Sequence, residues 1–155
     1  MIISRTPFRM SFAGGGTDLY AYYKDKPGAV VSSTINRYMY ITVNKKFDNG
    51  IRIAYSKTED VETVRQIMHP LVRESLLELG INGGLEITST ADVPAKGTGL
   101  GSSSSYTVGL LHALFAYQGK NCTRDHLASL ASKIEIEMWR TYWQTRPICS
   151  SFWRL

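Results

Sequence analysis

The chain has 155 residues, of which 43% are hydrophobic and 20% charged, a composition that excludes a disordered chain and allows one domain with a sizeable core. The net charge of +5 does not by itself indicate a nucleic-acid partner, because residues 138–155 carry three arginines and no acid, while residues 1–137 hold 15 basic against 13 acidic residues. No stretch reaches the roughly 18 apolar residues of a membrane span, and the start lacks a signal peptide, so we expect a soluble, cytoplasmic protein with no membrane partner.

Strand signals open the chain. Residues 2–13 are β-rich and contain Pro7, which predicts a kinked strand that ends at a glycine loop, Gly14-Gly15-Gly16. Either Thr17 or Asp18 can cap a short helical turn over 19–23. The β-branched and aromatic runs 28–35, 38–43 and 51–55 then predict a meander of three strands.

Helical spacing alternates with one more strand in the middle of the chain. Residues 61–68 and 71–79 predict two helices, the second ending at Gly80, and residues 85–89 predict a strand. A loop rich in proline and glycine then leads through Ser102–Ser105 into an apolar helix that ends near Gly119.

Thr123 caps a further predicted helix over 124–137, after which neither helical nor strand periodicity continues. All three tryptophans of the chain lie in residues 138–155. We therefore predict a domain over 1–137 and an aberrant tail over 138–155. The two cysteines, Cys122 and Cys149, have no paired-ligand spacing and are expected to be free thiols.

The loop before the serines has the chemistry of an anion site. Gly97, Gly99 and Gly101 let the backbone approach a ligand closely, and the helix beginning at Ser102 points its first amides outward. A Walker A loop would need Gly-Lys-Ser/Thr, but Lys96 precedes the glycines, and their alternation does not match the Rossmann fingerprint. On spacing alone, the alternative interpretation as a flexible loop followed by a serine-capped helix is also possible.

The segment from Pro94 to Ser105, PAKGTGLGSSSS, resembles the phosphate-binding motif of the GHMP kinase superfamily. The opening RTPFRMSFAGGGTDLYAYY resembles its substrate-side motif, with Gly-Gly-Gly-Thr-Asp where galactokinases have Gly-Glu-His-x-Asp. This departure favours the D-glycero-D-manno-heptose 7-phosphate kinase branch. The resemblance covers residues 1–137 and implies an α+β fold, a two-layer sheet-and-helix N-terminal kinase domain, here truncated.

The resemblance also implies a role for each matching residue. Glu135 would bind Mg²⁺ together with Ser103, although on spacing alone it could be a solvated helix carboxylate. Arg9 and Asp18 would lie on the sugar side, where they could equally form an ordinary ion pair. The ATP-binding set would be Pro94, Lys96, Gly97, Thr98, Gly99, Leu100, Gly101, Ser102, Ser103, Ser104 and Ser105, and the substrate-binding set Arg9, Gly14, Gly15, Gly16, Thr17 and Asp18. The three histidines are interpreted as structural.

One family residue is missing. The catalytic aspartate of the superfamily follows the helix that carries the glutamate, within Gly-x-x-x-Asp, and no such stretch follows Glu137. One choice of codons for residues 138–155, read one base later, gives CGEPIGKQDQYAAAFGG, which contains that stretch. We therefore hypothesise that a two-base deletion, a pseudogene event or a sequencing error shifted the reading frame near Met138, and we expect this chain itself to be catalytically inactive and prone to aggregate.

The function predicted for the parent protein is an ATP- and Mg²⁺-dependent kinase that phosphorylates the anomeric hydroxyl of a small-molecule sugar phosphate, D-glycero-D-manno-heptose 7-phosphate. Another GHMP small-molecule kinase, such as a fucokinase-like enzyme, is the first alternative. A non-catalytic nucleic-acid-binding module is the second, but Lys45, Lys46, Arg52 and Lys57 do not interleave with aromatic residues as a nucleic-acid stripe would. We therefore expect no nucleic-acid partner.

Overall fold

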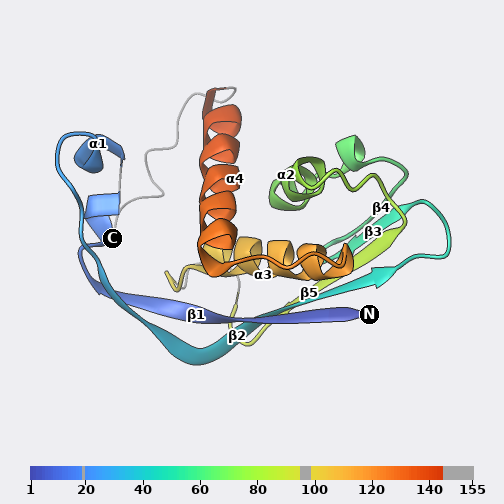
Figure 1. The fold of residues 1–155 in the computed structure, drawn as a ribbon, viewed down its shortest axis with the longest axis horizontal. Helices are drawn as coiled ribbons and strands as arrows, with labels where there is room; N and C mark the ends of the chain where they lie inside the picture. Colours follow the sequence, from blue (N-terminus) through green and yellow to red (C-terminus); the bar gives the residue numbers. More distant parts are fainter. Residues whose placement is uncertain (19, 95–98, 145–155) are drawn as a thin grey trace.

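A single mixed sheet forms one layer of the fold (Figure 1). The computed structural model describes residues 1–18, 20–94 and 99–144, without the side chains of 18, 20, 21 and 137–144. Within these residues the sheet has five strands in the order β1-β2-β5-β3-β4. Neighbouring strands are antiparallel except β3 and β5, which are parallel. The strands are β1 (Ile2–Ala13), β2 (Val31–Lys45), β3 (Ile51–Ala54), β4 (Thr58–Val61) and β5 (Leu85–Ala91).

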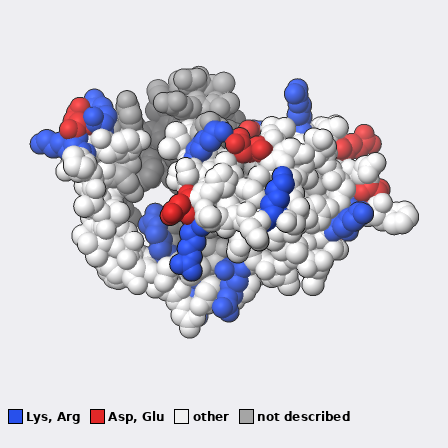
Figure 2. All heavy atoms as spheres, viewed as in Figure 1, with Lys and Arg blue, Asp and Glu red and all other residues white. Residues whose placement is uncertain are grey.

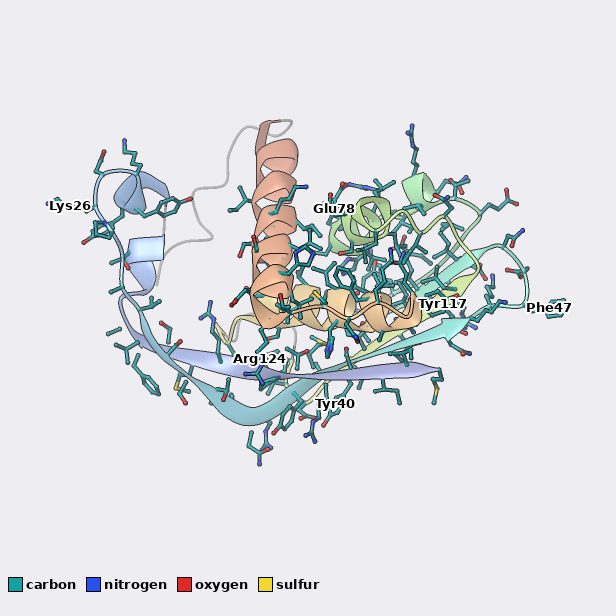
Figure 3. All side chains as sticks on the ribbon, viewed as in Figure 1. Lys26, Tyr40, Phe47, Glu78, Tyr117 and Arg124 are labelled. Carbon is teal, nitrogen blue, oxygen red and sulfur yellow. The ribbon has the colours of Figure 1, made fainter. Side chains whose placement is uncertain are left out.

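The helices form the second layer. Figure 1 shows α2 (Pro70–Glu78), α3 (Ser102–Tyr117) and α4 (Arg124–Gln144) on the same face of the sheet. The predicted α+β arrangement of two layers is thus confirmed. Thr123 caps α4 as predicted, since its hydroxyl accepts the His126 amide at 3.3 Å. The opposite face of the sheet carries no helix in this view, and Figure 3 shows Tyr40 pointing away from the helices on that side.

The apolar core lies between the two layers, with α3 at its centre. Alternate residues of the inner strands point towards the helices, and α3 is buried on most of its circumference, as expected for a helix covered by both the sheet and other helices. The fully buried large side chains include Ile41, Ile51, Ile53, Leu85 and Ile87 from the sheet, Leu76 from α2, Leu110, Leu111 and Leu114 from α3, and Ile134 from α4.

Strands β1 and β2 continue beyond the core as an exposed two-stranded arm (Figure 1). The arm comprises the end of β1 from Arg9 and the start of β2 from Val31, and the β1 ladder is irregular between Pro7 and Arg9, where we predicted a kink. Its tip carries the 3₁₀ turn η1 (Gly15–Asp18) and the single helical turn α1 (Tyr20–Tyr23).

The predicted meander is wrong. Most of the run 28–35 and all of the run 38–43 belong to one strand, β2, which begins at Val31, and β5 separates β2 from β3. Strand β5 takes this place because it can pair with both neighbours and bury Leu85 and Ile87 completely, which is what a central strand requires.

One further predicted helix is wrong, and another ends later than predicted. Residues 61–68 do not form an α-helix: β4 occupies Thr58–Val61, and only the 3₁₀ turn η2 (Val64–Gln66) follows, closed by a Thr63–Gln66 capping box. Helix α4 does not end at Glu137 but continues to Gln144.

A small aromatic cluster packs against the core. The His69 ring stacks on Tyr106 at a centroid distance of 5.0 Å and meets the edge of Tyr55 at 4.8 Å. Glu59 accepts hydrogen bonds from the Tyr55 hydroxyl and the His69 amide. Burial lowers the pKa of His69, against a smaller opposing effect of the Glu59 charge, which favours the neutral form of the ring within the packed cluster.

Candidate active site

The N-terminus of α3 is the structural centre of the candidate site. Gly101 precedes the helix in a left-handed conformation with φ of 67°, which favours glycine, and its carbonyl accepts the first helical hydrogen bond from the Ser105 amide at 3.0 Å. Ser103 and Ser104 therefore lie in the first turn, where amides have no intrahelical acceptor and the helix dipole is positive. The predicted start of this helix at Ser102 is confirmed.

Hydroxyl groups of this first turn converge on one carboxylate of α4. Ser103 Oγ lies 3.2 Å from Glu135 Oε1, and Ser104 Oγ lies 3.3 Å from Glu135 Oε2. The serines and Glu135 are separated by about thirty positions in the chain, yet both serine hydroxyls donate to the same carboxylate. The structure thus brings together Ser103 and Glu135, the two residues predicted as metal ligands.

Arg9 joins the same site from β1. Its backbone amide donates to the Leu100 carbonyl at 3.2 Å. Its side chain crosses Gly101 so closely that a Cβ placed there would be 3.2 Å from Arg9 Cγ and Nε. A guanidinium beside the N-terminus of α3 adds to the positive potential of the helix dipole at this point.

The other predicted site residues divide into two groups. Pro94, Gly99 and Leu100 flank Ala95–Thr98, and Lys96, Gly97 and Thr98 lie outside the described residues. Gly14, Gly15, Gly16 and Thr17 lie at the tip of the β1–β2 arm, while the side chain of Asp18 is not described.

Two predicted ligand residues already use their hydrogen-bonding groups within the fold. Ser105 donates its amide to Gly101 and its hydroxyl to the Pro7 carbonyl at 3.2 Å, which fixes α3 to β1. The Thr17 hydroxyl lies 2.7 Å from the Gly14 carbonyl and accepts the Ala29 amide at 3.0 Å, which closes the base of the glycine loop. These side chains are therefore held as supports of the backbone around the site.

Sequence reasoning missed one residue of the cluster. Thr107, one helical turn after Ser103, is 0% exposed, and its Oγ1 lies 3.0 Å from Glu135 Oε1 and 3.0 Å from the Ser103 carbonyl. The signal in the sequence was its spacing of four from Ser103, which places both residues on one face of a helix.

The chemistry of this cluster suits a hard divalent cation. It offers a half-buried carboxylate and serine hydroxyls, the oxygen donors that Mg²⁺ prefers when phosphate oxygens and water complete its shell. Within the described part of the chain, His, Cys, Asp and Glu side chains form no group of three that could hold a metal by themselves. A phosphate ligand would therefore have to supply part of the coordination.

Charges are mixed over the visible surface. Figure 2 shows Lys and Arg side chains on several elements of this face with Asp and Glu side chains among them. Among the described residues, no helix has the length and apolarity required to cross a membrane. Cys122 is a free thiol, as predicted, while Cys149 lies outside the described residues.

Comparisons with known proteins identify the family to which the sequence is similar. The family description "GHMP kinases N terminal domain" matches residues 62–141. The D-glycero-alpha-D-manno-heptose 7-phosphate kinase of Campylobacter jejuni is 30% identical over 151 residues, which cover 88% of this chain and 43% of that protein.

Solved structures agree with the family match. A D-glycero-D-manno-heptose 1-phosphate kinase from Bacteroides thetaiotaomicron superposes with a TM-score of 0.78 at 25% identity, covering 90% of this chain and 49% of that one. The mevalonate kinase of Methanococcus jannaschii, 21% identical with a TM-score of 0.71 over 88% of this chain and 46% of its own, shares the fold. The chain spans less than half the length of each of these three relatives.

Proposed function

This chain belongs to the family of GHMP kinase N-terminal domains, and on that premise we propose that it forms the phosphate-binding part of a kinase that transfers a phosphoryl group from ATP to a sugar phosphate in the presence of Mg²⁺. The observation that carries the proposal is the meeting of three elements at one point: the first turn of α3, Glu135 on α4 and Arg9 on β1.

Each element has a distinct task in this proposal. Amides and hydroxyls at the start of α3 hold phosphate oxygens in place of water. A magnesium ion held by Ser103 and Glu135 would neutralise charge on the phosphate chain. Arg9, packed over Gly101, supplies a fixed positive charge between the phosphate loop and the arm that carries the glycine-rich turn.

The nucleotide half of the proposal can be tested on the 155-residue chain by calorimetric titration with ATP. We expect binding to be tighter with Mg²⁺ than with EDTA, and we expect Glu135→Gln to lose this difference while keeping the metal-free affinity. Glu78→Gln is the matched control, because Glu78 pairs with Lys133 on the α2 side of α4, away from the serines. Absence of ATP binding, or full Mg²⁺ dependence in Glu135→Gln, would refute the assignment.

For the acceptor, we propose D-glycero-D-manno-heptose 7-phosphate, phosphorylated at its anomeric hydroxyl. Support comes from the named activity of the Campylobacter jejuni relative and from the glycine-rich turn at the tip of the arm. A panel of sugar phosphates and free sugars, including fucose, offered to a protein restored to the full length of its relatives would decide. Preferential turnover of fucose or of another small molecule would move the protein to a different member of the superfamily.

We also propose that residues 138–155 are read in a shifted frame, so that the chain itself lacks the aspartate that would orient the attacking hydroxyl. The support is the concentration of all tryptophans in this segment and the family-like stretch that one base of shift restores. Sequencing the DNA across the codons for Glu135 to Trp143 tests it. Codons incompatible with the shifted reading would end the proposal, as would phosphorylation of the heptose phosphate by the purified 155-residue chain.

A further inference from the structure

The Thr107 hydroxyl has one proton to donate and two hydrogen-bond acceptors within reach. Its Oγ1 lies 3.0 Å from both the Ser103 carbonyl and Glu135 Oε1, and the side chain is fully buried between α3 and α4. A threonine in a helix commonly donates to the carbonyl four residues back, so the Ser103 contact alone would be ordinary. The Glu135 contact is the unusual one. A carboxylate is a stronger acceptor than a carbonyl, so the Thr107 hydroxyl donates its hydrogen bond to Glu135.

The two ends of the Glu135 carboxylate are held differently. Oε1 contacts both the buried Thr107 hydroxyl and the exposed Ser103 hydroxyl, whereas Oε2 contacts the Ser104 hydroxyl. Thr107 is too deeply buried to touch a ligand at the surface. It can nevertheless fix the carboxylate from behind, while the serine side stays open to solvent.

Resting on the function proposed above, we propose that Thr107 is a positioning residue, which orients Glu135 for cation binding through its buried hydroxyl and can redirect its hydrogen bond to the Ser103 carbonyl when the carboxylate turns towards the cation. Only the hydroxyl proton has to rotate, because both acceptors already lie at hydrogen-bond distance. Thr107 therefore keeps a partner in either arrangement, which avoids the cost of an unsatisfied buried hydroxyl. Because Thr107 already orders the Glu135 side chain, cation binding costs less side-chain conformational entropy.

The test compares the affinity of the full 155-residue chain for ATP in Mg²⁺ with its affinity in EDTA, and takes the ratio as the readout. Thr107→Val keeps the shape of the side chain and removes the hydroxyl, and we expect its ratio to fall by about 10- to 100-fold, the usual effect of removing a group that orients a metal ligand. Thr107→Ser should restore the ratio. In the Glu135→Gln background, Thr107→Val should have no further effect on it.

Ser4→Ala is the structural control, because the Ser4 hydroxyl donates to the Gly109 carbonyl at 2.8 Å, also between an outer element and α3, but without contact to Glu135. It should lower the melting temperature and leave the ratio unchanged. If Thr107→Val does not fold, Thr107→Ala is measured in the same way. A folded hydroxyl-free variant with the wild-type ratio would overturn this inference alone, whereas a wild-type chain without Mg²⁺-dependent binding would overturn the proposed metal site together with it.

Discussion

Replacing Gly109 by alanine should destabilise the domain, although alanine is the better helix former. Gly109 lies in the middle of α3, where the helix packs against β1. A Cβ at this position would be 2.8 Å from Thr6 Oγ1 and 3.4 Å from Ser4 Oγ. The first distance is far inside normal contact, and a β-branched side chain on a strand cannot turn away without cost.

One favourable and two unfavourable terms set the magnitude of the change in the free energy of unfolding. Alanine in place of glycine gains about 1 kcal/mol of helix propensity. Overpacking a tight contact costs about 1–3 kcal/mol. Displacement of the helix would also weaken the bond from Ser4 to the Gly109 carbonyl, which contributes about 1 kcal/mol. We therefore expect Gly109→Ala to lower the free energy of unfolding by about 1–2 kcal/mol, or the melting temperature by about 2–8 °C for a domain of this size.

Urea unfolding followed by circular dichroism measures the change, and a double-mutant cycle identifies its cause. Thr6→Ala removes the atom that a new Cβ would meet, so Gly109→Ala should become neutral or stabilising in that background, with a coupling of about 1–2 kcal/mol. If Gly109→Ala stabilises the wild-type chain by the full propensity gain, the close approach of α3 to β1 does not limit packing, and this reasoning fails.

Three further outcomes follow from the packing. Leu114→Ala, which empties a fully buried position of α3, should lower the free energy of unfolding by about 2–5 kcal/mol in urea titrations. Because burial lowers the pKa of His69, the unfolded chain binds more protons, so stability should fall as pH drops below about 6.5; thermal melts of His69→Gln should lack this component, and an identical pH profile would contradict it. Thr17→Val removes the hydroxyl that accepts the Ala29 amide, so hydrogen exchange of that amide should accelerate while exchange in the core stays unchanged.

Local sequence signals were sufficient to predict those features that depend only on the residues of one element. The end of α2 near Gly80, the Thr123 cap of α4 and the start of α3 at the first of four successive serines, after Gly101, all follow from local residue preferences at helix ends, and all three are found. The kink at Pro7 likewise follows from the ring and missing amide of proline.

Pairing between distant segments could not be obtained in this way. The place of β5 between β2 and β3 depends on contacts across forty or so residues, and adjacency in the chain wrongly suggested a meander. The error at 61–68 has a related cause. Valine and isoleucine spaced by three resemble a helix face, but Thr58–Val61 instead completes the sheet beside β3, and only one 3₁₀ turn fits before α2 begins.

The candidate site shows the same division. Spacing singled out the glycine loop and serines, and family resemblance singled out Glu135, which the structure places in contact with Ser103 and Ser104. Thr107 was missed because its spacing of four from Ser103 places it on the same helix face but does not reveal a partner that lies 28 residues away on another helix. The position of Arg9 over Gly101 was equally inaccessible, since it depends on how β1 crosses the start of α3.

Helix α3 supplies both the central packing element of the domain and the end that faces the candidate ligand. Its buried residues and its first turn belong to one rigid segment, so a ligand that orders the serines must also oppose unfolding of the whole layer. Melting temperature can thus serve as a direct readout of nucleotide occupancy.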